Sequence, residues 1–140
     1  MKTLLKLAGL TGLASLALLT AHAPAAQAAG TPDQSWSITG AKLDWTDRIT
    51  GEDADQLWLE DTKSDSASAY VSVKHPNGRT YKAKASGYRD IQILGHGAGA
   101  VQYTVYMPSI PAGKTASVKL CLSDGWTVRG STCKSISITE

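Results

Sequence analysis

The sequence predicts an all-β protein, a small antiparallel β-sandwich of the immunoglobulin-like type with one disulfide. Apolar and polar residues alternate with a period of two through most of residues 30–140, which is the spacing of half-buried strands. No stretch has the apolar periodicity of an amphipathic helix. Turn signals of glycine, proline and asparagine separate about eight short alternating segments. A small barrel is the alternative architecture.

Residues 1–29 have the composition of a secretory signal peptide. Two lysines precede an apolar stretch, Leu7–Leu19, and Ala26–Ala28 then has the small residues that signal peptidase recognises. The stretch is too short for a transmembrane helix, and no second apolar segment follows it. We therefore expect residues 30–140 to be secreted as one extracellular domain that has no membrane partner. Gly30–Ser35 is expected to form a flexible N-terminal arm.

The first half of the domain contains three predicted strands, at Ser35–Thr39, Lys42–Trp45 and Gln56–Asp61. A polar connection rich in serine and aspartate, Asp61–Ser68, follows them. Ala69–Lys74 is the next predicted strand, because its valines alternate with polar residues.

A turn is predicted at His75–Gly78, and its length sets the register of the hairpin around it. A three-residue loop at Pro76–Gly78 places apolar residues opposite apolar residues on one face and polar residues opposite polar residues on the other. The resulting pairs are Val73 with Tyr81, Val71 with Ala83, and Ser72 with Lys82. A two-residue loop would move every side chain to the opposite face, so the longer loop is favoured.

The second half continues with a predicted hairpin, in which Asp90–Leu94 and Val101–Met107 flank the glycine-rich tip Gly95–Gly99. This tip lacks the lysine, the serine or threonine and the helix of a phosphate-binding loop. Pro108–Lys114 has the proline and glycine of a turn. The last two strands are expected at Thr115–Leu122 and Thr132–Thr139.

The two cysteines of the chain, Cys121 and Cys133, are expected to form a disulfide, because an isolated pair in an exported protein is usually oxidised. Closing a loop of this length is worth about 3 kcal/mol in the chain-entropy model. Placing the two cysteines opposite each other also places Val118 opposite Ile136, with the bridge on the outer face. Lys134, which then lies opposite an inward leucine, fits this register least well.

Charge is divided between the two halves of the domain, although residues 30–140 are close to neutral overall. Residues 30–68 hold nine acidic and three basic side chains, and residues 69–140 hold nine basic and three acidic ones. Such a division can orient association with a partner. The alternative is that the halves fold together and neutralise each other.

Catalysis is not expected, and neither is a cofactor. Beyond residue 29 the only histidines are His75, in a turn, and His96, between glycines, and no serine-nucleophile motif flanks them. A disulfide between the cysteines leaves no thiolate nucleophile. We therefore expect a protein that is not an enzyme.

The acidic segment Asp44–Asp55 offers oxygen ligands, but its spacing does not match a calcium-binding EF-hand loop. A solvated acidic loop is favoured, and calcium binding remains open as the alternative. Transition-metal binding is not expected with two histidines and no free thiol.

Four basic residues, Lys74, Arg79, Lys82 and Lys84, are expected near one another on the face of one hairpin. A solvated face is the favoured interpretation, and a patch for an acidic partner or an anionic glycan is the alternative. Nucleic acid is not expected, because such a site needs exposed aromatics between the basic residues.

Two loops are candidates for binding a protein partner. Ser123–Gly130 is closed at its base by the predicted disulfide and contains Trp126 and Arg129, residue types that are enriched among binding hot spots. Ile110–Lys114 is stiffened by proline and presents Lys114. The alternative is that both are ordinary hairpin connections.

The segments Pro111–Lys114, Val118–Leu122 and Cys133, behind an alanine-rich signal peptide, resemble small secreted β proteins of actinobacteria. One similar group is the extracellular protease inhibitors of such bacteria, from which this chain departs in having one bridge instead of two and no matching reactive-site motif. The other is the small adaptor subunit of secreted umbrella-shaped toxin particles. This resemblance implies a β domain that joins a large toxin-bearing subunit to a trypsin-like, lectin-linked subunit.

The sequence thus favours a secreted, non-catalytic protein-binding subunit or adaptor of an extracellular complex, an antibacterial toxin complex included. Its partners would be other secreted proteins, such as a trypsin-like domain or a large toxin subunit. One alternative is an inhibitor in which Arg129 or Lys114 fills the specificity pocket of a trypsin-like protease. Another is a glycan or cell-wall binding module that uses Trp126 or Trp58.

Overall fold

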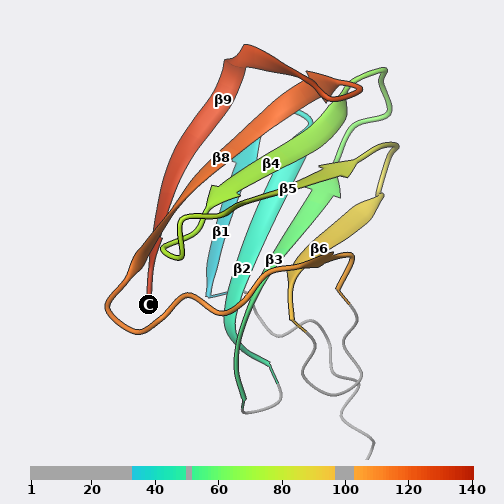
Figure 1. Ribbon diagram of the computed structural model, residues 1–140. Coiled ribbons are helices and arrows are strands. Elements are labelled where there is room, and N and C mark those ends of the chain that lie inside the picture. The colour runs from blue at the N-terminus through green and yellow to red at the C-terminus, as the bar shows by residue number, and fades with distance from the viewer. Residues whose placement is uncertain (1–32, 50–51, 97–102) are drawn as a thin grey trace, which may run out of the picture.

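Two β-sheets packed face to face form the described part of the protein (Figure 1). The computed structural model describes residues 33–49, 52–96 and 103–140. The predicted signal peptide, residues 1–29, and residues 97–99 of the predicted glycine tip lie outside these ranges. The described chain contains strands and no helix, which confirms the all-β class.

The first sheet has the strand order β1-β2-β3-β6-β7. Its strands are β1 (Gln34–Ile38), β2 (Ala41–Ile49), β3 (Glu52–Asp61), β6 (Ile91–Gly95) and β7 (Val105–Tyr106). Gln34 and Ser35 pair with β2, so the predicted flexible arm does not extend to Ser35.

The second sheet has the order β5-β4-β8-β9, and all of its neighbouring strands are antiparallel. Its strands are β4 (Ser68–Lys74), β5 (Thr80–Ala85), β8 (Thr115–Asp124) and β9 (Thr127–Thr139).

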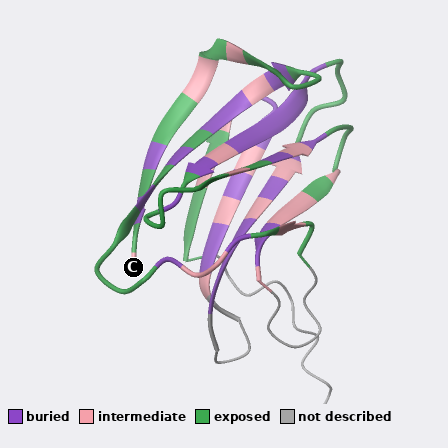
Figure 2. Cartoon of the chain, viewed as in Figure 1, coloured by how far each residue is buried: buried purple, intermediate pink, exposed green. Residues whose placement is uncertain are grey.

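The core lies between the two sheets and is built from the inward positions of each strand, as the predicted alternation requires. Figure 2 shows buried residues along the middle strands and exposed ones in the loops and along β9. The largest fully buried apolar side chains come from both sheets and from the segment before β8: Leu43, Leu57, Leu59, Leu94, Met107, Ile110, Leu120, Ile138, Val71, Val73 and Val118.

The β4–β5 hairpin has the predicted register, with Val73 opposite Tyr81, Val71 opposite Ala83 and Ser72 opposite Lys82. The His75 amide donates to the Arg79 carbonyl at 2.9 Å and closes the three-residue loop. Gly78 has φ +85°, the left-handed conformation that such a loop requires at its last position.

The hairpin predicted for Asp90–Leu94 and Val101–Met107 is wrong, because β7 runs parallel to β6. Leu94 lies opposite Val105, and both face the core. The Thr104 hydroxyl accepts from the Ile93 amide at 2.8 Å, and the Thr104 amide donates to the Ile93 carbonyl at 2.8 Å. Alternation shows which side chains point inward but not the direction of the strand, so the sequence pattern alone allowed the wrong pairing.

The predicted Cys121–Cys133 disulfide is present, and Val118 lies opposite Ile136 as expected. The long loop expected at Ser123–Gly130 is wrong. β8 continues to Asp124 and β9 begins at Thr127, which leaves only a two-residue turn.

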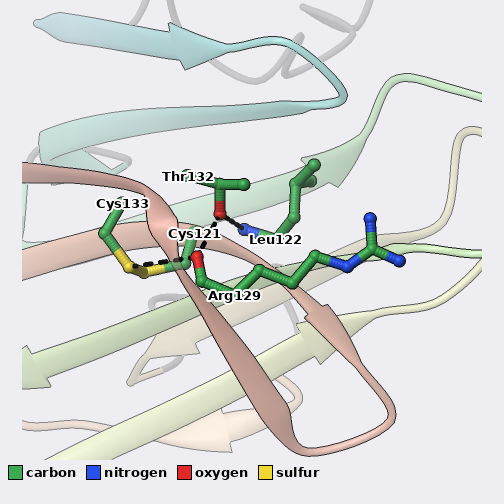
Figure 3. Close-up of a disulfide and its surroundings, with 5 residues drawn as sticks. All are labelled: Cys121, Leu122, Arg129, Thr132 and Cys133. Atoms are coloured by element: carbon green, nitrogen blue, oxygen red, sulfur yellow. Dashed lines mark hydrogen bonds between the residues drawn. A yellow bond between two sulfur atoms is a disulfide. The ribbon is translucent and has the colours of Figure 1, made fainter.

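The extra residues are absorbed by a bulge in β9, where the register with β8 shifts between Leu120 and Leu122. Figure 3 shows how Thr132 bridges this break beside the disulfide. Its hydroxyl accepts from the Leu122 amide at 2.9 Å and donates to the Arg129 carbonyl at 2.7 Å, so neither backbone group is left without a partner.

Candidate functional site

Trp126 is presented at the tip of the β8–β9 turn and is 64% exposed. Gly125 before it has φ +58°, as a type II′ turn requires at its first central position. The indole makes an edge-to-face contact with Tyr70 at 6.4 Å between ring centroids, and the Lys84 ammonium lies 5.2 Å from its ring centroid. These contacts hold an exposed aromatic against the outer face of the second sheet, so little conformational freedom remains to be lost on binding.

Arg129 lies in β9 and is engaged with Asp124 across the turn. Its Nε donates to Asp124 Oδ2 at 2.8 Å, and its Nη2 donates to Oδ1. The hydrogen bond from Arg129 lowers the pKa of Asp124, and the hydrogen bond to Asp124 raises the pKa of Arg129. The paired guanidinium braces the turn instead of projecting freely from it.

Lys114 is exposed but lies at the opposite end of β8 from Trp126 and Arg129. Ten residues of β-strand correspond to roughly 30 Å at about 3.3 Å per residue. Figure 1 shows the β8–β9 turn at the top of the view and the segment leading into β8 at the bottom. The predicted partner-binding residues therefore do not form one site.

The backbone around Lys114 already makes hydrogen bonds. The Lys114 amide donates to the Pro111 carbonyl at 2.9 Å, and Gly113, with φ +72°, completes a tight turn. The Gly113 amide donates to the Glu140 carbonyl, and the Lys114 carbonyl accepts from the Glu140 amide. This segment is a closed turn tied to the end of β9 and not an extended strand that a protease could pair with.

A second exposed aromatic site, which sequence reasoning missed, lies along the β6–β7 side of the first sheet. We define it as Ile91, Tyr103 and Tyr106, which are 44%, 43% and 58% exposed. The two tyrosine rings are in edge contact, with centroids 5.8 Å apart. The aromatic content of this segment was visible in the sequence. The parallel pairing of β7, which sets where these side chains lie, was not.

Trp58, one of the residues considered for glycan binding, is half-buried on the outer face of the same sheet. Its indole Nε1 donates to Gln56 Oε1 at 3.2 Å, and Gln56 Nε2 donates to the His96 carbonyl at 3.2 Å. Gln56 is fully buried and lies across Gly95. Trp58 is therefore fixed by its neighbours more than it is presented to solvent.

No protein-family model, curated protein or solved structure matches this chain. Among residues 33–49, 52–96 and 103–140, no helix has the length and apolarity needed to cross a membrane. The function is therefore argued from the surfaces described above.

The acidic segment is not the solvated loop that was expected, since Asp55 is completely buried. Carboxylate oxygens of Asp47, Asp55 and Glu140 lie within 4.8 Å of one another. Asp55 Oδ1 accepts from the indole of Trp45 at 2.8 Å, and its Oδ2 accepts from the Ile110 amide. These bonds tie β3 to the segment before β8, which is a structural role. The sequence singled out the two aspartates but not Glu140.

His75, one of the two histidines considered for catalysis, is buried in the β4–β5 loop. Its Nδ1 accepts from the Asn77 amide at 3.1 Å, and its Nε2 contacts the Ser109 carbonyl at 3.2 Å. The neutral tautomer protonated at Nε2 satisfies both contacts. His75 thus joins the loop to the segment before β8.

Proposed function

We propose that the protein is a secreted, non-catalytic adaptor, which joins two other secreted proteins in an extracellular complex. The observation that carries this proposal is the presence of two separate exposed aromatic sites on one braced scaffold. One is Trp126 at the β8–β9 turn, and the other is Ile91, Tyr103 and Tyr106 beside β7.

An adaptor must hold two partners at once, so its contact sites have to be far enough apart to be occupied together. Trp126 belongs to the second sheet, whereas the β7 site belongs to the first. Aromatic residues are enriched at protein interfaces, because they bury a large area at a small entropic cost. Both sites are ordered by edge contacts between rings, Trp126 with Tyr70 and Tyr103 with Tyr106.

The N-terminal sequence supports export, as residues 1–29 have the charge and apolar pattern of a signal peptide. The resemblance to the small adaptor subunit of umbrella-shaped toxin particles supports an antibacterial toxin complex. Its partners would then be a large toxin-bearing subunit and a trypsin-like subunit.

The trypsin-inhibitor alternative has less support. Arg129 is engaged by Asp124, and Lys114 lies beside a tight turn whose backbone is tied to Glu140. A trypsin-like partner would therefore dock onto this protein as a binding surface, without Arg129 or Lys114 in its specificity pocket.

The test is capture of partners from the producing organism's culture fluid with the tagged protein, read by mass spectrometry. We expect two large secreted proteins in stoichiometric amounts. Trp126→Ala should lose one of them and keep the other, and Tyr103→Ala/Tyr106→Ala should show the reverse. Lys134→Ala, an exposed change outside both sites, should keep both. Recovery of the wild-type protein alone, or retention of both partners by both aromatic variants, would refute the proposal.

A further inference from the structure

The outer face of the second sheet carries lysines and hydroxyls. Alternation and register place four lysines on it: Lys74, Lys82, Lys84 and Lys119. The hydroxyl residues that are not buried on the same face include Ser72, Thr80, Thr115, Ser117, Ser135, Ser137 and Thr139. The only carboxylate within these four strands is that of Asp124, at the end of β8, and Arg129 holds it.

The lysines are regularly spaced across the face. Lys82 lies opposite Ser72, and Ser72 lies opposite Lys119, so these two lysines are separated by two strand spacings, about 10 Å. Lys82 and Lys84 are two residues apart on one strand, about 7 Å. Within the part of the chain that the structure describes, none of the four lysines forms an ion pair. Their charges therefore add to a positive potential on this face.

This face does not have the composition of a protein interface. Lysine is depleted at such interfaces, whose centres are apolar, whereas the row across the middle of this face is Lys82, Ser72, Lys119 and Ser135. Burying four lysines under a protein would also remove their hydration at a high cost. A hydrated polyanion can neutralise the lysine charges while the ammonium groups stay partly solvated. The serine and threonine hydroxyls can form hydrogen bonds with the same polyanion.

The number of exposed aromatic rings at this face favours an anionic glycan over a single-stranded nucleic acid. Trp126 covers the end of the face near Lys84, and Tyr70 beneath it is buried. A single-stranded nucleic acid stacks successive bases on several aromatics, and this face offers one. One indole, with a flat apolar surface and a polar edge, suits one sugar ring.

We propose that the outer face of the second sheet binds a linear anionic glycan, with its charged groups on the four lysines and one sugar ring against Trp126. This goes beyond the adaptor function. It shares Trp126 with one of the two proposed protein sites, so a glycan and that partner would compete for the indole, whereas the β7 site stays free. An adaptor that also binds a polyanionic glycan would bring the partner held at the β7 site to a surface that displays one.

The test measures binding of size-defined heparin oligosaccharides to the secreted chain at several salt concentrations. Dextran of matched length, poly-glutamate and single-stranded DNA of matched charge are the comparison ligands. We expect heparin to bind with an affinity that falls steeply with salt, and dextran to show no binding. Lys82→Gln/Lys119→Gln should weaken heparin binding about tenfold or more.

The matched control is Lys63→Gln/Lys114→Gln, which removes the same charge from exposed positions off this face. This control should change the affinity for heparin by less than about threefold, because neither lysine lies on the proposed binding face. A nonspecific effect of net charge would instead weaken binding equally in both variants. Trp126→Ala should weaken heparin binding and leave any residual binding of poly-glutamate unchanged. Both lysine variants should keep the wild-type melting temperature.

Equal losses in the two lysine variants would overturn the proposal, and so would equal affinity for dextran. Binding of DNA or poly-glutamate as tight as that of heparin would show instead a surface for nucleic acids or acidic proteins. Partner capture through Tyr103 and Tyr106 does not involve this face, so failure here and failure of the adaptor function are separable.

Discussion

At Gly95 the backbone of β6 passes so close to β3 that no side chain fits. An added Cβ would lie 2.7 Å from the Asp55 carbonyl oxygen and 2.8 Å from the Gln56 side chain. Glycine is therefore required here by close approach of two backbones, and not by an unusual φ.

We predict that Gly95→Ala lowers the free energy of unfolding by about 2–3 kcal/mol, because backbone atoms must move to admit the methyl group. Urea denaturation followed by tryptophan fluorescence measures this, since Trp58 is bonded to Gln56 beside Gly95. Gly130→Ala is the control, because an added Cβ there meets nothing within 4 Å. A loss as large at Gly130 as at Gly95 would contradict the steric explanation.

The ion pair between Arg129 and Asp124 makes a prediction about pH. The hydrogen bond from Arg129 lowers the pKa of the Asp124 carboxyl below its usual value. The pair therefore stabilises the fold above the usual aspartate pKa, and this contribution is lost as pH falls through the lowered pKa of the folded state. We expect Arg129→Ala to raise the pKa of Asp124 toward its usual value, as NMR titration of its carboxyl carbon would show. An unchanged pKa in this variant would mean that the pair is not formed in solution.

At the scale of elements, loops are held in place by buried aspartates. Asp61, at the end of β3, accepts from the Lys63 amide at 3.1 Å and from the Gly87 amide at 3.0 Å, and its carbonyl accepts from the Arg89 amide at 2.7 Å. One side chain thus fixes the β3–β4 and β5–β6 loops. Arg89 adopts the left-handed conformation, with φ +66°, in this arrangement.

Asp61→Ala should destabilise the protein by about 1–3 kcal/mol, because the hydrogen bonds from two backbone amides to its buried carboxylate are lost. Hydrogen exchange should show faster exchange at the Lys63 and Gly87 amides. Glu60→Gln, a change at the half-buried neighbouring position, is the matched control and should leave both rates unaltered. Slow exchange at both amides in Asp61→Ala would show that other groups hold the loops.

The β8–β9 hairpin depends on its cross-link as well as on its strands. Replacing Cys121 and Cys133 together by alanine should cost about 3 kcal/mol of stability, because the unfolded chain regains the freedom of the closed loop. Thermal unfolding of the double variant measures the loss. If the loss is well below about 1 kcal/mol, the bulge and the turn hold the hairpin without the bridge.

At the scale of the whole molecule, charge is divided between the two layers. Acidic residues gather in β2 and β3 of the first sheet, and lysines gather in β4, β5, β8 and β9 of the second. Three ion pairs between described side chains are Lys42–Asp44, Lys63–Asp65 and Arg129–Asp124. Each of these three pairs joins residues of the same half of the domain.

Because these three pairs are local and largely exposed, they add little to stability. We predict that the melting temperature changes by less than about 5 °C between about 0.02 M and about 1 M NaCl, which screens exposed charges. Heparin binding should disappear over the same range. A large fall in melting temperature with salt would show that charge pairing between the layers does stabilise the fold.

The sequence alone determined those features that depend on local pattern. Alternation and turn length gave the β4–β5 register. The isolated cysteine pair behind a signal peptide gave the disulfide, and placing the two cysteines opposite each other gave the pairing of Val118 with Ile136. These features involve strands that are neighbours along the chain. The loop length fixes the pairs of β4 and β5, whereas the cysteines fix those of β8 and β9 below the bulge.

Tertiary structure decided what depends on contacts between distant segments. Strand direction does not change which side chains alternate inward, so the parallel pairing of β7 and the site at Tyr103 and Tyr106 were not predictable. The predicted strand Thr115–Leu122 already separated Lys114 from Trp126, but the two-residue turn at Trp126 depends on the pairing that extends β8 to Asp124 and on the bulge in β9. The lysine face needed four strands placed side by side, and the burial of Asp55 needed the segment before β8. The alternation of a sequence predicts which face of a strand is buried. Tertiary packing determines which strands and segments then lie beside it.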